Sequence, residues 1–143
     1  MKKQGFLVLS SVSLFVVLVA GWPLYAQSSV TLKSDIPFDF VVADRSFPAG
    51  SYTVRTLSPG IALVQSADYK TAGIVSTLGK QNGDAATKTK LVFRRYGNTH
   101  FLAEIWTKGN DNGREIQKCK AEREMIAGMK SHEERTSVAA QLR

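Results

Sequence analysis

The sequence predicts an all-β fold: an antiparallel β-sandwich or small β-barrel of about seven strands, with an N-terminal signal helix and a C-terminal helix. Two observations lead to this fold class. Short stretches of alternating apolar and polar residues recur between residues 30 and 107, and alternation with a period of two is typical of strands that bury one face. Sequences rich in proline, glycine and asparagine separate these stretches, and short strands at such spacing favour a sandwich or barrel.

Recognisable turns bound the expected strands. Ser58-Pro59-Gly60-Ile61 places proline second and glycine third, as a type II turn requires, and Gly97-Asn98 fits a two-residue hairpin connection. Pro37 lacks an amide hydrogen and therefore suits the start or the edge of a sheet. Residues 79–88 are predicted to form a polar loop. The expected strands are residues 30–33, 36–43, 51–57, 61–66, 71–78, 91–96 and 99–107.

The first 26 residues have the order of a secretory signal peptide. Lys2 and Lys3 precede an apolar run over residues 6–20, and the small residue Ala26 precedes Gln27; a basic start, an apolar middle and a small residue at the cut mark such a signal. We expect cleavage between Ala26 and Gln27, and a location in the periplasm or outside the cell. The alternative is an uncleaved N-terminal membrane anchor. The signal is favoured because the apolar run is shorter than the roughly 20 residues of a membrane span.

Beyond residue 107 the sequence predicts that the strands stop. Residues 108–113 suit a polar loop, and Asn112 with Glu115 three positions later suits the start of a helix over residues 114–127 that ends at Gly128. The polar residues 131–143 are expected to form a short second helix or a frayed tail. The predicted organisation is a signal peptide (1–26), an antiparallel β domain (27–107) and a carboxy-terminal part (108–143) with a loop, a surface helix and a polar tail.

Charge and cysteine content limit the partners of the exported chain. Removing Lys2 and Lys3 leaves 17 basic and 12 acidic side chains, so the formal net charge falls from +7 to +5. These charges are spread along the sequence, whereas nucleic-acid binders concentrate Lys and Arg on one face, so the sequence argues against nucleic acid as a partner. Cys119 is the single cysteine. It is either a free thiol or forms an intermolecular disulfide, which an oxidising compartment permits.

The hairpin around Gly97-Asn98 supplies the candidate binding site. If these two residues are the whole connection, Arg95 faces His100 and Leu91 faces Glu104. Alternation then places four polar or aromatic side chains on one face of the hairpin: Arg95, His100, Glu104 and Trp106. A polar cluster beside apolar residues is typical of ligand pockets. The alternative is structural, with Arg95 and Glu104 as an ion pair at the rim and Trp106 in the core.

Sequence signals of catalysis and of metal or cofactor binding are missing. His100, His132 and Cys119 lie far apart in the sequence, whereas a zinc site needs three or four clustered ligands. A calcium loop with Gly113 in its glycine position would put Lys108 at the first ligand position. No nucleophile elbow, phosphate-binding loop or dinucleotide fingerprint occurs. The prediction is therefore a chain that is not an enzyme and has no metal and no cofactor.

Four segments together resemble an uncharacterised family of small exported β-rich proteins that is common in acidobacteria. The segments are residues 36–42 (IPFDFVV), 47–54 (FPAGSYTV), 91–97 (LVFRRYG) and 101–106 (FLAEIW), and the likeness covers residues 31–125. The resemblance implies an exported β-rich domain with a helical end. It carries no established activity, so it assigns no role to any residue.

The sequence thus predicts an exported, non-catalytic protein that acts as a binding or structural module of the cell envelope. Two roles stay open within this class. The chain is a carrier that holds a small apolar ligand between the sheets, next to Trp106, or it associates with itself through its sheet faces and Cys119. A hydrolase is the third alternative, which no local motif supports.

Overall fold

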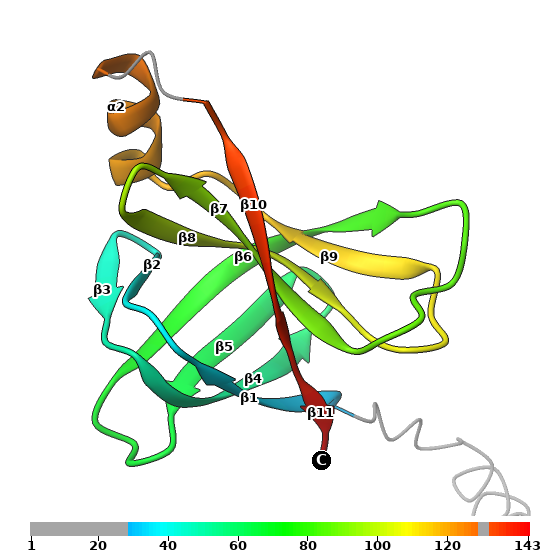
Figure 1. The fold of residues 1–143 in the computed structure, drawn as a ribbon. Coiled ribbons are helices and arrows are strands. Elements are labelled where there is room, and N and C mark those ends of the chain that lie inside the picture. The colour runs from blue at the N-terminus through cyan, green and yellow to red at the C-terminus, as the bar shows by residue number, and fades with distance from the viewer. Residues whose placement is uncertain (1–28, 129–131) are drawn as a thin grey trace, which may run out of the picture.

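The computed structural model describes residues 29–128 and 132–143. It confirms that the chain is mainly β: eleven strands form one open, mixed sheet, and α2 is the one helix in this part of the chain (Figure 1). The elements are β1 (Thr31–Ile36), β2 (Phe40–Val42), β3 (Arg45–Phe47), β4 (Gly50–Ser58), β5 (Ile61–Ser66), β6 (Ala72–Gln81), β7 (Lys90–Tyr96), β8 (Thr99–Trp106), β9 (Asn112–Ile116), α2 (Lys120–Gly128), β10 (Glu134–Ala139) and β11 (Gln141–Leu142).

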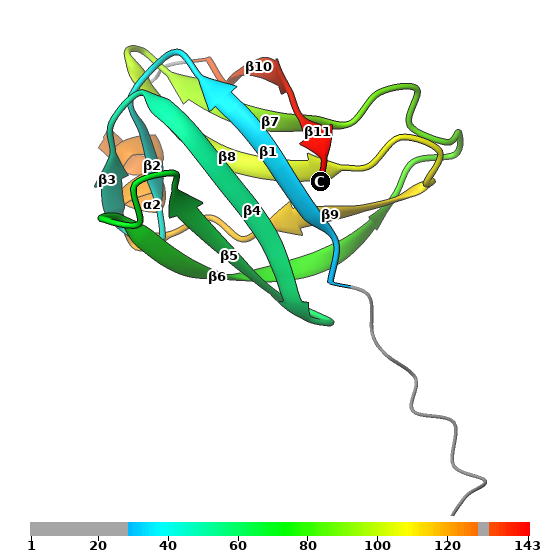
Figure 2. The same ribbon diagram turned by 90° about the horizontal axis from the view of Figure 1, so that it is seen from below.

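Nine of the strands follow one path around the molecule, in the order β10-β7-β8-β9-β6-β5-β4-β1-β11. All neighbours along this path are antiparallel. The two ends of the path, β10 and β11, are separated in the sequence by Ala140 alone. Because β10 pairs with β7 and β11 pairs with β1, the last segment of the chain brings the two ends of the curled sheet together (Figure 2).

β2 and β3 form a short hairpin outside this path. β2 pairs with β8 in parallel, so the prediction of a purely antiparallel sheet is wrong at this pairing. The turn of the hairpin holds Ala43 and Asp44 at positive φ, 50° and 60°, the left-handed geometry of a type I′ turn. The Asp44 carboxylate accepts a hydrogen bond from the Ala121 amide at the start of α2, 2.7 Å away. This bond is the main reason that the pKa of Asp44 lies below its ordinary value.

Alternate residues of the strands fill the inside of the curled sheet. In β1, Leu32, Ser34 and Ile36 are buried and the residues between them are exposed, as burial of one face requires. Aromatic rings pack in the interior, and the Phe40 ring centroid lies 5.0 Å from that of Tyr52. The core consists of Leu32, Ile36, Phe40, Val42, Phe47, Tyr52, Val54, Ala62, Val64, Val75, Leu91, Phe93, Leu102, Ile105 and Ile116. The space around these rings is therefore filled by side chains.

The structure confirms both predicted turns. Gly60, between β4 and β5, has a φ of 92°, the positive value that a type II turn requires at its third residue. Gly97 and Asn98 join β7 to β8, with Tyr96 opposite Thr99, and Gly97 also has a positive φ of 61°. Glycine suits both turns because it has no Cβ atom to oppose a left-handed backbone.

The prediction that the strands stop at residue 107 is wrong. β9, β10 and β11 follow, so the sheet has eleven strands rather than about seven. The predicted tail or short helix at 131–143 contains β10 and β11, and β6 extends to Gln81, into the predicted loop 79–88. The carboxy-terminal part (108–143) therefore completes the sheet instead of lying beside a separate β domain.

The predicted helix begins later than expected. Asn112 starts β9 rather than a helix, because β9 pairs with both β6 and β8. These two ladders hold the backbone of Arg114 in an extended conformation, and α2 begins only at Lys120. The described part of α2 extends to Gly128.

The predicted signal helix, its cleavage between Ala26 and Gln27, and the alternative membrane anchor lie outside the described residues. Over residues 29–128 and 132–143, no helix is long and apolar enough to cross a membrane. Export and location therefore stay predictions.

Candidate functional site

A β-bulge in β8 decides where the predicted site residues lie. β7 and β8 keep the predicted register near their turn, but it then shifts, and Val92 rather than Leu91 lies opposite Glu104. The additional residue on β8 is Ala103. One extra residue turns the following side chains to the other face of the sheet. Glu104 and Trp106 therefore lie on the outer face of the sheet instead of the inner one.

The four predicted site residues are thus separated into two pairs. Arg95 and His100 stay opposite each other near the turn of the hairpin. The Arg95 Nε atom donates a hydrogen bond to the Gly97 carbonyl oxygen (2.7 Å), and an Nη atom of the same guanidinium lies 3.5 Å from the Glu134 carboxylate. The predicted ion pair between Arg95 and Glu104 is therefore wrong, and the cluster of four residues does not form.

His100 is held by aromatic packing. Its ring stacks on Phe38 with centroids 3.9 Å apart, and its Nδ1 atom is buried with no hydrogen-bond partner among the described residues. Burial and then the charge of Arg95 lower the pKa of His100, against a hydrogen bond with the Asp39 backbone that raises it. The ring is therefore neutral at neutral pH and serves as a packing element at the end of the hairpin.

Glu104 and Trp106 are buried together on the outer face. The Trp106 Nε1 atom donates a hydrogen bond to Glu104 Oε2 (2.8 Å), and each residue is only 5% exposed. Burial raises the pKa of Glu104, but hydrogen bonds from Lys80 and Trp106 and the charges of Lys80 and Arg135 outweigh burial, so the pKa is lowered. The Trp106 ring covers Gly113, where a Cβ atom would lie 2.6 to 2.7 Å from three ring atoms. Trp106 is thus a buried packing residue outside the interior of the sheet.

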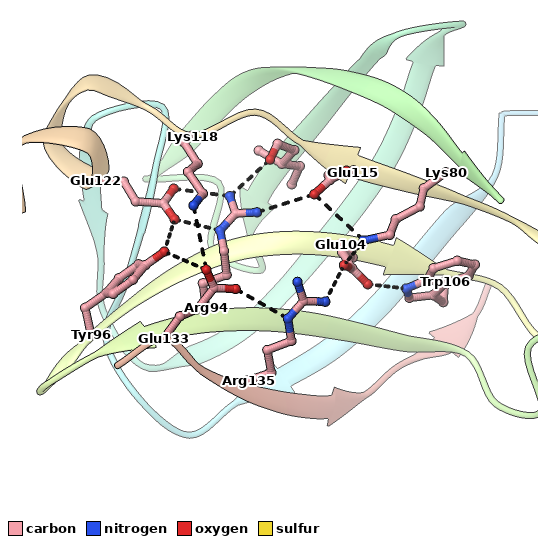
Figure 3. A network of polar contacts seen from close by, with 11 residues as sticks. Lys80, Arg94, Tyr96, Glu104, Trp106, Glu115, Lys118, Glu122, Glu133 and Arg135 are labelled. Carbon is pink, nitrogen blue, oxygen red and sulfur yellow. Dashed lines mark hydrogen bonds and ion pairs between the residues drawn. The ribbon is translucent and has the colours of Figure 1, made fainter. Parts of the chain in front are cut away.

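Glu104 belongs to a closed ring of polar contacts on the outer face of the sheet and against α2 (Figure 3). Carboxylates alternate with donors around this ring. Glu104 itself contacts two cations of the ring, Lys80 (2.5 Å) and Arg135 (2.9 Å). Lys118 is attached to the ring through Glu133, so four cations face four carboxylates. In order, the ring is Glu104, Lys80, Glu115, Arg94, Glu122, Tyr96, Glu133 and Arg135, which returns to Glu104.

Arg94 and Glu122 form the buried centre of the ring and attach α2 to the sheet. The Nε and Nη2 atoms of Arg94 donate hydrogen bonds to the two carboxylate oxygens of Glu122, at 2.6 and 3.2 Å. Nη2 also donates to the Ile116 carbonyl oxygen (3.1 Å). The two charged side chains are 3% and 1% exposed. Breaking such a pair is costly because one charge stays buried without its partner.

Tyr96 completes the ring as a neutral donor. Its hydroxyl oxygen lies 3.2 Å from Glu122 and 3.3 Å from Glu133, and its one proton can be donated to only one of them at a time. Burial, followed by the charges of both glutamates, raises the pKa of Tyr96. The charges of the ring cancel and its contacts are made within the chain, so we interpret the ring as structural.

A pocket of about 490 Å³ lies at the end of the sheet where β1 begins, β4 ends and β9 begins. This is the end away from α2 in Figure 1. The floor of the pocket is apolar and is formed by the core residues Leu32, Val54 and Ile105. Hydroxyl and amide groups surround the floor, supplied by Thr56, Ser58, Thr107, Asn110 and Asn112.

Among the described residues, Arg114 is the one charged residue that lines this pocket. Ile116, two positions further along β9, belongs to the core, so strand alternation also turns Arg114 to the inner face. Glu115, between them, points outward and contacts Lys80 of the ring. Within residues 29–128 and 132–143, Arg114 forms no ion pair. A half-buried guanidinium is therefore available to an acidic group that enters the pocket.

Gly79 leaves room in the wall beside Arg114. It lies opposite Arg114 in the register of β6 and β9, and on the same inner face as the buried residues Val75 and Thr77. A Cβ atom at Gly79 would have no neighbour within 4 Å. Because Gly79 lines the pocket, a larger side chain there would occupy its volume.

Sequence reasoning did not identify this pocket, because it placed Arg114 in a helix. The available signal is the alternation of Asn112, Arg114 and Ile116 with Gly113 and Glu115. A stretch of five residues with two charges and two apolar or small positions is compatible with a strand and with a helix, so the pattern did not decide between them.

The other predicted features do not form a second site. Cys119 is half-buried, and burial raises the pKa of its thiol; the intermolecular disulfide stays a prediction. In the part of the chain that the structure describes, no three His, Cys, Asp or Glu side chains gather into a metal-binding group. Comparison with known protein families, with curated proteins and with solved structures gives no match for this chain. The resemblance to exported acidobacterial proteins and the absence of catalysis therefore stay predictions.

Proposed function

We propose that the chain is an exported, non-catalytic binding module of the cell envelope that holds a small amphipathic ligand with an acidic end. The ligand lies in the pocket at the end of the sheet, with its apolar part on Leu32, Val54 and Ile105 and its carboxylate at Arg114. The observation that carries this proposal is the position of Arg114, a cation on the inner face of the sheet with no ion-pair partner among the described residues.

The chemistry of the pocket supports an amphipathic acid over a purely apolar ligand. A cavity of a few hundred Å³ with an apolar lining and a few placed polar groups is typical of small-molecule sites. Arginine keeps its charge at any physiological pH and binds carboxylates through two parallel N–H donors. A partly buried charge without a partner is unfavourable, and a bound carboxylate removes this penalty. A neutral alkyl chain carries no charge that could pair with Arg114, so it leaves this penalty in place.

Export and the shape of the sheet belong to the same proposal. The basic start, apolar run and small residue Ala26 at the amino end support export. β10 and β11 are the two ends of the strand path and follow each other in the sequence, which supports a small barrel rather than a sandwich. The mouth of a barrel is a common ligand site. We therefore place the ligand of the predicted carrier in the pocket at the end of the sheet rather than next to Trp106.

Calorimetric titration of residues 27–143 with decanoate and with decanol tests the proposal. These residues contain every described strand and α2, and the two probes differ in the acidic group. We expect decanol to bind about 10- to 150-fold more weakly than decanoate, because a hydrogen bond to a charged group contributes about 1.5–3 kcal/mol. Arg114→Gln should remove this difference. Lys108→Gln is the matched control, since Lys108 is exposed and does not line the pocket.

Gly79→Leu tests the location of the ligand. The leucine side chain fills the pocket, so we expect binding of decanoate to be lost while the unfolding temperature is kept. Gly83→Leu is the control, because a Cβ atom at Gly83 also meets nothing within 4 Å but lies in the loop after β6. Binding that survives Gly79→Leu, or equal affinity for the acid and the alcohol, would contradict the proposal.

A further inference from the structure

Three cations that are far apart in the sequence converge on one outer face of the sheet. Lys33 and Arg55 alternate with the buried residues of β1 and β4, so both side chains point outward. Arg143 follows β11, and its amide donates a hydrogen bond to the Thr31 carbonyl oxygen (3.0 Å). Thr31 in turn lies opposite Arg55. We call Lys33, Arg55 and Arg143 the basic face; Figure 2 shows β1 and β4 side by side in this region.

No ion pair joins the basic face to a carboxylate among the described residues. The three basic side chains line a groove of about 290 Å³, together with Leu63 and Tyr69, and no aspartate or glutamate lines it. Asp35, the next outward residue of β1 after Lys33, accepts a hydrogen bond from the Ser51 hydroxyl instead. Asp68, in the turn after β5, accepts hydrogen bonds from the Ser66 hydroxyl and the Lys70 amide. The six glutamates all form ion pairs elsewhere, with cations of the ring, of the β7–β8 hairpin or of α2. Lys33, Arg55 and Arg143 therefore form a group of cations without ion pairs in the part of the chain that the structure describes.

Exposed apolar side chains continue the basic face across β5 and β6. In the register of these strands, Leu63 has Arg55 on one side and Ile74 on the other. Ile74 is 62% exposed, and Tyr69 in the adjoining turn is 75% exposed. Soluble monomers rarely expose contiguous apolar patches unless the patch binds something. The apolar strip consists of Leu57, Ile61, Leu63, Ile74 and Leu78.

We propose that the basic face and the apolar strip together dock the chain on an anionic lipid surface. The cations meet lipid phosphates, and the apolar side chains enter the boundary between headgroups and acyl chains. Peripheral membrane segments combine the same two features. A soluble polyanion would engage the cations but leave Ile74 and Tyr69 in water. A symmetric second copy would bring two basic faces into one interface, so charge favours the lipid surface.

Flotation of residues 27–143 with phosphatidylglycerol-containing vesicles tests this proposal. We expect binding to these vesicles, little binding to pure phosphatidylcholine, and a decrease as salt screens the charges. Lys33→Gln with Arg55→Gln should lower the partition coefficient about 30-fold, since each cation near an anionic surface contributes about fivefold. Lys88→Gln with Lys108→Gln removes the same charge at exposed positions outside the basic face and should have a much smaller effect.

Ile74→Gln tests the contribution of the apolar strip. Ile74 is exposed, so the fold should be kept while vesicle binding falls and the weaker binding of soluble polyphosphate does not change. Three results would overturn the proposal: equal losses in the two double variants, polyphosphate binding without vesicle binding, or a dimer in solution that Ile74→Gln dissociates while vesicles are not bound. None of the substituted residues lines the pocket of the proposed function, so the two proposals fail independently.

Discussion

Arg94→Met removes the cation from the buried centre of the ring and leaves Glu122 without its strongest partner. In the folded chain Glu122 accepts two hydrogen bonds from Arg94 and lies 3.2 Å from the Tyr96 hydroxyl. Among the described residues, the Tyr96 hydroxyl is then the one side-chain donor left to Glu122, which is 1% exposed. The bond from Arg94 to the Ile116 carbonyl oxygen is lost as well. We expect the free energy of unfolding to fall by about 3–5 kcal/mol, the usual cost of leaving one member of a buried ion pair unpaired.

Urea unfolding of residues 27–143 measures this loss, because Trp106 is the only tryptophan in that range and its fluorescence reports on the outer face. Arg123→Met is the matched control: Arg123 is exposed on α2, so we expect a change below about 0.5 kcal/mol. Adding Glu122→Leu to Arg94→Met should restore most of the stability, since both charges are then absent. A loss below about 1 kcal/mol for Arg94→Met, or a double variant that loses the sum of the two single losses, would refute this reasoning.

The packing of Trp106, the ion pairs of Glu104 and the buried hydroxyl of Thr77 each give a further prediction. Gly113→Ala places a Cβ atom 2.6 Å from the Trp106 ring, so the free energy of unfolding should fall by about 1–3 kcal/mol and the tryptophan fluorescence should change. Gly79→Ala is the control, because its Cβ atom meets nothing within 4 Å and stability should not change. Equal losses of stability in the two variants would contradict the packing of Trp106 on Gly113. The folded pKa of Glu104 lies below its ordinary value of 4.5. The contribution of its carboxylate to stability is therefore complete above that pH and is lost as the pH falls through the lower folded pKa. The unfolding temperature should fall more steeply with acid in the unmodified chain than in Glu104→Gln, and parallel plots of unfolding temperature against pH would contradict this. Thr77→Val removes a buried hydroxyl with no partner among the described residues and should raise the free energy of unfolding by about 1 kcal/mol; lower stability in urea would show that the hydroxyl has a partner.

Local turn chemistry made several strands predictable. Gly60 and Gly97 lie at turn positions where the backbone has a positive φ. Glycine at these positions, with the residues next to it, is enough to predict the turns from the sequence alone. The expected strands on either side of these turns agree closely with the structure, and the expected strand at residues 61–66 has the bounds of β5. Elements whose boundaries depend on adjacent residues were therefore predicted well.

The bulge at Ala103 could not be predicted, and it moved half of the candidate site to the other face. Residues 101–103 are all apolar and buried, so this part of β8 has no alternation that would reveal where the pairing shifts. The register changes because Glu104 faces the ring while Ile105 reaches the core. That outcome depends on β9, β10 and α2, which are distant in the sequence.

The carboxy-terminal strands and the basic face depend on pairings between distant segments. β10 has Val138 as its one aliphatic side chain other than Ala139, and it is a strand because β7 offers a free edge. Arg143 joins Lys33 and Arg55 only because β11 then pairs with β1. Propensity and periodicity describe neighbours in the sequence, so they do not show which separated charges meet.

A methyl NMR titration of residues 27–143 with decanoate tests the proposed pocket most directly. We expect the methyl signals of Leu32, Val54 and Ile105 to shift together until the site is saturated, because these side chains form the floor of the pocket. The shifts should disappear in Arg114→Gln at the same decanoate concentration. Shifts confined to Ile74 on the outer face, or unchanged floor methyls at any concentration, would contradict the account.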